Sequence, residues 1–257
     1  MSLLAVVLAA TMASPASAIH RGYDAPIGSF RFMVSLRLTG EPDRHRCGGT
    51  LIEPDMVLTA AHCVGRVPDG GLVAVIGADT PDWPSAPRVS TLGHRIPTTY
   101  NPSYDDRDDI AVVRLATRQV NPGIRLAARE PRVGDRGVTA GWGCTNAPPV
   151  CKVRAEKLQA SSQTVLPDRS CGLDVIWTAP IYNTRTNICT RGTKPRSTVN
   201  RGDSGGPLLV RDRSGVLRQV GVTALGSDSS KKLRAGFTSV PLERIWIAGA
   251  IKSLRTG

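Results

Sequence analysis

The chain has 257 residues, enough for a sizeable buried core in one domain or two. Aromatic residues make up only 4%, while 26 glycines and 19 prolines punctuate short β-branched segments, which favours an all-β barrel or sandwich over a helical bundle. The net charge of +12 comes mainly from arginine, and the basic residues lack interleaved aromatics, so specific nucleic-acid recognition is poorly supported. The charge indicates a solvated basic surface, or alternatively one that attracts acidic partners or anionic polymers.

The N-terminus carries an apolar leader. Residues 3–13 are too short to span a bilayer, and Ala16-Ser17-Ala18 fits the small-residue rule for signal-peptidase cleavage. We therefore predict a signal peptide over residues 1–18 and a secreted mature chain, free of the membrane, that begins at Ile19. A short membrane anchor is the alternative interpretation.

The first half of the chain contains a series of short strands. They are predicted over residues 32–38, 47–52, 56–59, 72–76 and 110–115. The third strand leads directly into His62 and Cys63, and Cys63 is near enough in sequence to bond Cys47, so this histidine is fixed at a strand end. The three other histidines lack this setting and are interpreted as structural or exposed: His20, His45 and His94.

Four acidic residues crowd the approach to the strand at residues 110–115. Only Asp109 leads directly into this apolar strand, and the others, Asp105, Asp106 and Asp108, are interpreted as part of a solvated loop. A buried carboxylate without a partner is costly. We therefore expect Asp109 to meet a donor such as an imidazole N–H.

The second half begins after a polar connector at residues 118–136. Strands are predicted over residues 138–143 and 216–225, and an amphipathic helix over 241–254 has apolar residues at helical spacing, beginning with Leu242 and Ile245. Six cysteines behind a leader indicate disulfides. Fifteen pairings are possible, and proximity along the chain favours three of them: Cys47–Cys63, Cys144–Cys151 and Cys171–Cys189.

One short segment, Gly202-Asp203-Ser204-Gly205-Gly206-Pro207, surrounds a hydroxyl with glycines. Glycine lets the backbone turn where a side chain would clash, so N–H groups can point at a common spot. Ser204 is a candidate nucleophile, and the N–H groups of Gly202 and Ser204 are candidates for an oxyanion hole.

The order His, Asp, Ser in these segments resembles the chymotrypsin/trypsin-like serine proteases, and we expect a secreted member of the bacterial type. Cys47-Gly48-Gly49 and Gly141-Trp142-Gly143 extend the resemblance over nearly the whole mature chain. The family implies two packed six-stranded antiparallel β-barrels, the first at about residues 19–117 and the second at about 137–240, followed by the C-terminal helix.

The resemblance also implies a role for each site residue. Ser204 would attack the substrate as nucleophile, His62 would act as general base, and Asp109 would orient the imidazole, in an acyl-enzyme mechanism of peptide hydrolysis. Gly202 and Ser204 would supply the oxyanion donors. Asp203 would pair with the ammonium group of Ile19 after cleavage, although His20-Arg21-Gly22 departs from the small apolar residue and two glycines usual in the family.

The specificity pocket departs from the trypsin pattern. By position Thr198 matches the pocket base, where trypsin-like members have an acid, and the other expected pocket residues are Val199, Ala224, Leu225 and Gly226. A neutral pocket disfavours substrate lysine or arginine, so we expect an uncharged residue on the acyl side of the cut bond, named P1. Asp228 at the rim would restore some basic preference.

The sequence gives no sign of a cofactor or a metal site. The loop after Gly77 lacks the paired glutamates of calcium-binding relatives. The expected partners are protein or peptide substrates and protein inhibitors, and the chain is expected to be a monomer. The alternative function is a catalytically weak or inactive family member that binds anionic polymers or a protein partner through its basic surface.

Overall fold

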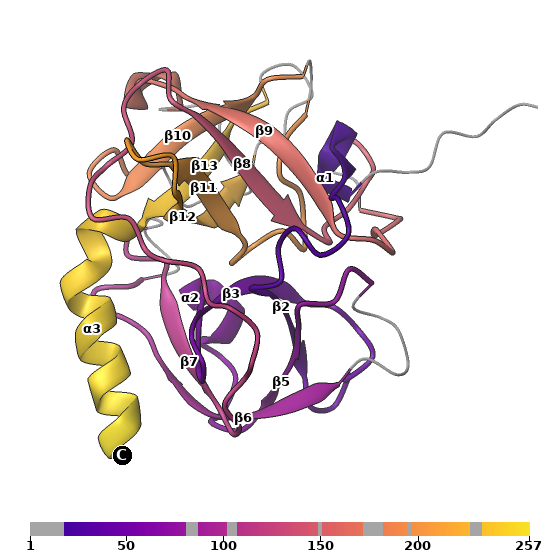
Figure 1. Cartoon of the computed structure of the whole chain (residues 1–257), viewed down its shortest axis with the longest axis vertical. Helices are drawn as coiled ribbons and strands as arrows, with labels where there is room; N and C mark the ends of the chain where they lie inside the picture. Colours follow the sequence, from indigo (N-terminus) through magenta and orange to yellow (C-terminus); the bar gives the residue numbers. More distant parts are fainter. Residues whose placement is uncertain are drawn as a thin grey trace, which may run out of the picture.

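The structure, a computed structural model, describes residues 18–80, 87–101, 107–148, 151–171, 182–194, 197–226 and 233–257. Apart from Ala18, the predicted signal peptide lies outside these ranges, and so does Asp228. In the described ranges, none of the helices combines the length and the apolar character needed to cross a bilayer. The chain forms two barrels stacked one above the other, with the last helix along their side (Figure 1).

The first barrel is a closed sheet of antiparallel strands in the order β2-β3-β4-β7-β6-β5. Its strands are β2 (Met33–Leu38), β3 (Cys47–Glu53), β4 (Met56–Thr59), β5 (Leu72–Ile76), β6 (Arg88–Arg95) and β7 (Ala111–Leu115). Five of them match predicted strands. No strand was predicted at β6, because this segment is polar, with arginine at both ends, and only two of its eight residues are buried.

The second barrel has the strand order β9-β10-β13-β12-β11-β8, and β8 also pairs with β9 to close it. Its strands are β8 (Arg136–Gly141), β9 (Gln159–Val165), β10 (Asn187–Gly192), β11 (Pro207–Arg211), β12 (Leu217–Gly226) and β13 (Ala235–Ser239), and the short β1 (Tyr23–Asp24) pairs with β9. Two six-stranded antiparallel barrels are therefore confirmed.

One apolar core runs through both barrels. Leu51 and Leu58 of the first barrel belong to the same buried cluster as Trp142 and Val222 of the second. A buried hydrogen bond of 2.6 Å from Thr50 Oγ1 to Gln219 Oε1 also joins β3 to β12. Because a close-packed core resists displacement, the two barrels hold the groups at their junction in fixed positions.

The last helix, α3 (Val240–Thr256), begins with a capped turn. Ser239 Oγ accepts from the N–H of Leu242, and Pro241 occupies the first turn, where its missing N–H does no harm. The helix is confirmed, but the predicted apolar stripe is wrong at two positions, since Leu242 and Ile245 are 55% and 90% exposed. The buried face instead comprises Val240, Ile247, Ala250 and Leu254.

The three predicted disulfides are all present: Cys47–Cys63, Cys144–Cys151 and Cys171–Cys189. The first ties β3 to the short helix α2 (Ala61–Val64), and the third ties the end of the 3-10 turn η1 (Asp168–Ser170) to β10. The N-terminal turn α1 (Ala18–Arg21) packs against the second barrel beside β9.

Candidate active site

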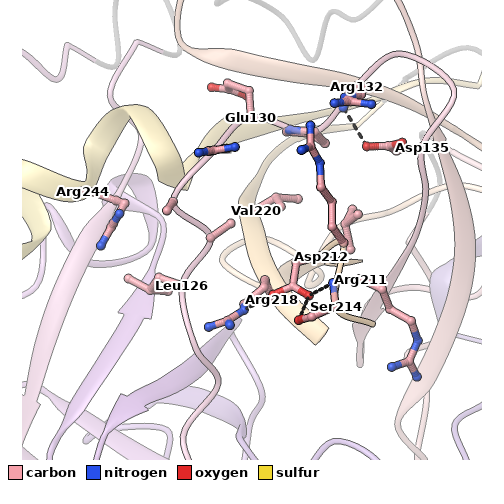
Figure 2. Close-up of a pocket in the computed structure, with 16 residues that line it drawn as sticks. Leu126, Glu130, Arg132, Asp135, Arg211, Asp212, Ser214, Arg218, Val220 and Arg244 are labelled. Carbon is pink, nitrogen blue, oxygen red and sulfur yellow. Dashed lines mark hydrogen bonds and ion pairs between the residues drawn. The ribbon is translucent and has the colours of Figure 1, made fainter. Parts of the chain in front are cut away.

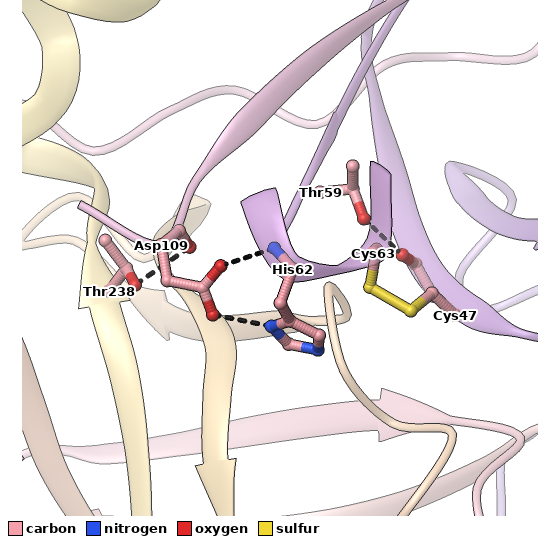
Figure 3. A network of polar contacts seen from close by, with 7 residues as sticks. Cys47, Thr59, His62, Cys63, Asp109 and Thr238 are labelled. Carbon is pink, nitrogen blue, oxygen red and sulfur yellow. Dashed lines mark hydrogen bonds and ion pairs between the residues drawn. A yellow bond between two sulfur atoms is a disulfide. The ribbon is translucent and has the colours of Figure 1, made fainter. Parts of the chain in front are cut away.

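His62 and Asp109 meet at the junction of the two barrels. Strand β4 ends at Thr59, and the single turn of α2 that follows carries His62; Asp109 stands just before β7. The His62 backbone N–H donates to Asp109 Oδ1 at 2.8 Å, and Nδ1 lies 2.6 Å from Oδ2 (Figure 3). The Asp109 side chain is 1% exposed and the His62 side chain 34%. The imidazole is thus oriented by a buried carboxylate, yet remains open to solvent.

Asp109 is also held by the second barrel. Thr238 Oγ1, on β13, donates to the main-chain carbonyl of Asp109 at 3.0 Å. Each carboxylate oxygen has a donor from His62, so the buried charge is not left without partners. The prediction that Asp109 meets an imidazole is therefore confirmed.

The turn that carries Ser204 packs against the segment that carries His62. The N–H of Gly48, on β3, donates to the Ser204 carbonyl at 2.7 Å. A Cβ at Gly205 would lie 3.2 Å from the N atom of Ala60, the residue that caps α2. Ser204 is half-buried, and in the described part of the chain its hydroxyl makes no hydrogen bond to His62. Catalytic hydrogen bonds often tighten only when substrate binds.

The backbone N–H groups of this turn differ in whether they have an acceptor. The N–H groups of Asp203, Gly205 and Gly206 donate to the carbonyls of Asn200, Thr223 and Asp203 respectively. Those of Gly202 and Ser204 have no acceptor among the residues that the structure describes. Gly202 has φ +97°, a conformation that glycine adopts without strain. An oxyanion hole requires N–H groups that have no other acceptor, and these two N–H groups meet that condition.

The Asp203 side chain points inward and is fully buried. Its carboxylate accepts from the N–H groups of Gly143 and Asn200, each at 2.8 Å, and burial raises its pKa to about 7. A Cβ at Gly143 would lie 2.5 Å from the carboxyl carbon, and one at Gly141 would also overlap the carboxylate. Both glycines of the Gly-Trp-Gly segment are therefore needed to make room for this acid.

His45, interpreted from the sequence as structural or exposed, is buried beside the turn that carries Ser204. It is 2% exposed, with Nε2 2.8 Å from the Gly202 carbonyl and Nδ1 2.8 Å from Ser35 Oγ. Burial lowers its pKa to about 4, so the ring is neutral; because a carbonyl only accepts, Nε2 donates to Gly202 and Nδ1 accepts from Ser35. This Ser–His pair is buried, and its contact with the turn is the hydrogen bond from Nε2 to the Gly202 carbonyl.

The two buried ionisable groups near the turn have opposite pH dependences. Unfolded His45 gains a proton below its ordinary pKa of 6.5, whereas folded His45 stays neutral to about 4, so its contribution to stability is lost as pH falls through this window. Folded Asp203 keeps its proton up to about pH 7, against an ordinary 3.8, so its contribution is lost as pH rises through that window. In the unaltered chain the two effects offset one another.

Single substitutions should expose each effect. In the uncleaved chain, and relative to the unaltered protein, His45→Gln should become less stable by about 3 kcal/mol, and Asp203→Asn more stable by about 4 kcal/mol, as pH rises from about 4 to about 7. Urea unfolding at a series of pH values measures this, and taking differences from the unaltered chain cancels all other titrating groups. Parallel stability curves for all three proteins would contradict the assignment.

Of the predicted pocket residues, Ala224, Leu225 and Gly226 lie on β12, whereas Thr198 and Val199 lie on the segment between β10 and the Ser204 turn. Thr198 is 1% exposed and its Oγ1 donates to the Arg234 carbonyl at 3.4 Å. Val199 is buried in the second-barrel core, and Leu225 packs beside the disulfide Cys171–Cys189. The half-exposed pocket residues are Ala224 and Gly226.

Ile19 is fully buried against the second barrel although the chain continues before it. His20 bridges to Thr198, whose N–H donates to the His20 carbonyl at 3.1 Å. The nitrogen of Ile19 is part of a peptide bond here, so it carries no charge to pair with Asp203. The predicted ion pair requires cleavage and remains a prediction.

One group of side chains in the described ranges comes close enough to share a metal ion: Cys47, His62 and Cys63. The disulfide between the two cysteines removes both thiolates as ligands. The arrangement therefore does not fit a metal.

Residues 19–247 match the protein family described as Trypsin. The chain belongs to the trypsin family. Granzyme B(G,H) of Mus musculus is 32% identical, over 98% of this chain and 100% of that protein. Trypsin of Sarcophaga bullata is 28% identical, over 92% and 90%. The solved structure of neuropsin, a serine protease expressed in the limbic system of mouse brain, superposes with a TM-score of 0.75 over 91% of this chain and 100% of that one, at 24% identity.

The trypsin-family chain is a serine endopeptidase, a hydrolase that acts on protein or peptide substrates. The expectation of a bacterial type is not supported, because the relatives found are animal proteins, from mouse, human and flies. The likeness to neuropsin shows the fold alone.

Proposed function

We propose that this trypsin-family protease cleaves peptide bonds with Ser204 as nucleophile, His62 as general base and Asp109 as the group that orients the imidazole. The observation that carries the proposal is the 2.6 Å contact between His62 Nδ1 and the buried Asp109 carboxylate. A carboxylate only accepts, so Nδ1 carries the proton and Nε2 is the basic nitrogen.

The proposed reaction has two halves. Nε2 of His62 takes the hydroxyl proton as Ser204 Oγ attacks the substrate carbonyl, and the N–H groups of Gly202 and Ser204 stabilise the oxyanion. The intermediate collapses, the C–N bond breaks, and the imidazolium gives its proton to the leaving amine. Water then attacks the acyl-enzyme by the same route and regenerates the Ser204 hydroxyl.

We propose an uncharged P1 preference, with Thr198 at the pocket base and Ala224 and Gly226 at its walls, and Val199 and Leu225 behind them. Thr198 Oγ1 donates to the main-chain carbonyl of Arg234, so this contact brings no carboxylate to the pocket base that could pair with a substrate cation.

The P1 preference can be measured with chromogenic peptides that differ only at P1. We expect kcat/KM for leucine, methionine or phenylalanine to exceed that for lysine and arginine by about tenfold or more, because an unpaired charge is costly to bury. Fastest cleavage after lysine or arginine would contradict the neutral pocket. Fastest cleavage after aspartate or glutamate would contradict the uncharged preference as well.

We further propose export after cleavage behind Ala18, which would free the Ile19 ammonium to pair with Asp203. Support comes from the burial of Ile19 and from the buried, raised-pKa carboxyl of Asp203, which a nearby cation would return to its ionised form. Edman sequencing of active, exported protein should begin at Ile19. Any other first residue in fully active material would contradict the proposal.

We also propose that the exported protease is a monomer and that protein inhibitors bind at the same site.

A further inference from the structure

A cavity of about 690 Å³ opens on the second barrel, where the connector between the barrels passes the hairpin of β11 and β12. Figure 2 shows side chains from three separate segments around it, with Arg132 on the connector, Arg218 on β12 and Arg244 on α3. None of the lining residues is a proposed catalytic or substrate-binding residue. This cavity therefore needs an explanation of its own.

Arginine dominates the charged residues of the lining. Six arginines line the cavity: Arg129, Arg132, Arg211, Arg213, Arg218 and Arg244. Three acidic side chains accompany them, namely Glu130, Asp135 and Asp212. The balance is therefore three positive charges in excess within one hollow.

Two of the arginines are engaged with neighbours. Arg218 Nε donates to Asp212 Oδ2 at 2.8 Å, and an Arg211 guanidinium nitrogen donates to the Gly215 carbonyl at 2.7 Å. Among the residues that the structure describes, the other four guanidinium groups have neither an acceptor nor an ion-pair partner, and all four residues are exposed: Arg129, Arg132, Arg213 and Arg244. Four cations without ion-pair partners, in a lining where arginines outnumber acids by six to three, favour an anionic ligand.

The chemistry of the lining narrows the class of anion. A guanidinium group forms a planar fork that matches sulfate, phosphate or carboxylate oxygens. The described lining has no aromatic side chain on which a nucleobase would stack, which disfavours single-stranded nucleic acid. The lining carboxylates repel an anion unless the ligand also carries hydroxyl groups that donate to them, as sugars do.

We propose that this cavity, which we name the arginine cavity, binds a sulfated polysaccharide through Arg129, Arg132, Arg213 and Arg244. The sulfate groups accept from the free guanidinium groups, and sugar hydroxyls donate to Asp135 and Glu130. Binding at this site is independent of the peptide hydrolysis proposed above, because the two sites share no residue.

The test compares two triple variants that remove the same charge. Arg129→Gln/Arg132→Gln/Arg213→Gln removes three lining arginines, whereas Arg31→Gln/Arg169→Gln/Arg191→Gln removes three exposed arginines that do not line the arginine cavity. Binding of a fluorescent heparin hexasaccharide to the purified full chain is followed by anisotropy at about 0.15 M salt. The cavity variant should bind about tenfold more weakly and with a shallower salt dependence, while the control changes little.

Other outcomes would overturn the proposal. Equal weakening in both triple variants would mean that net charge alone drives binding. Undetectable binding of the hexasaccharide, or equal binding of its desulfated form, would show that the arginine cavity is not a sulfate-specific site. Tighter binding of an oligothymidylate or a polyglutamate peptide of similar charge would assign the cavity to nucleic acid or to an acidic protein segment. Thermal unfolding and cleavage of a short peptide, unchanged in the cavity variant, show that it is folded.

Discussion

Replacing Ser204 with alanine should lower kcat for a peptide substrate by about four orders of magnitude or more. The hydroxyl oxygen is the proposed attacking atom, and alanine leaves only the oxyanion donors and substrate binding to assist hydrolysis. Ser204 is half-buried on a turn, and its hydroxyl makes no hydrogen bond within the described ranges, so we expect little change in the free energy of unfolding. A peptide-hydrolysis assay measures kcat, and urea unfolding measures the free energy of unfolding.

The chain supplies a matched control in Ser35. This serine also contacts a histidine, at 2.8 Å, but both Ser35 and His45 are buried. Ser35→Ala removes two buried hydrogen bonds, one to His45 and one from Arg37, so it should reduce stability by about 2 kcal/mol, and its loss of kcat should be far smaller than that of Ser204→Ala. Substantial activity of Ser204→Ala, or failure of a phosphonate reagent to label Ser204 in the unaltered protein, would contradict the catalytic assignment. Such an outcome would favour the weakly active, anion-binding alternative.

His62→Ala should match the loss caused by Ser204→Ala, and the double variant should lose little more. Residues that act as one unit show strongly non-additive effects, since removing either partner abolishes the same attack on the substrate. Additive losses would mean that the two side chains contribute separately. This comparison tests the juxtaposition of Ser204 and His62 that the contacts of Gly48 and Ala60 support.

Replacing Gly205 with alanine should be among the most destabilising single changes in the chain. Its φ is +79°, which costs a residue with a Cβ about 1–2 kcal/mol. The new Cβ would also overlap the Gly48 carbonyl and Thr59 Oγ1, where a backbone atom cannot step aside. Overpacking of this kind costs about 1–3 kcal/mol more. Activity should fall as well, because the turn would move Ser204.

Gly215 provides the control for this change. Its φ of +81° is nearly the same, but nothing lies within 4 Å of the position its Cβ would take. Gly215→Ala should therefore lose only the stability that the backbone strain costs, and it should keep full activity. The difference between the two variants in urea unfolding isolates the contact of the Ser204 turn with β3 and β4. Equal losses of stability would mean that this contact is loose.

The order of the chemical groups along the chain was enough to predict much of this protein. A buried acid at the start of an apolar strand needs a donor, and Asp109 indeed meets His62. Short apolar strands with turn residues between them predicted an all-β fold, and nearness along the chain predicted all three disulfides. Such features depend on neighbours in sequence, which is why they could be inferred without coordinates.

Other features exist only because distant segments meet. His45 has no distinguishing sequence context, yet packing places it between Ser35 and Gly202, 157 residues further along the chain. Strand β9 is too polar to be predicted, and forms because β8 and β10 supply its hydrogen-bonding partners. The arginine cavity likewise gathers residues from the connector, a hairpin and α3. The sequence thus determined which groups are available and the tertiary structure decided which of them meet, since burial, pKa and charge density depend on neighbours in space.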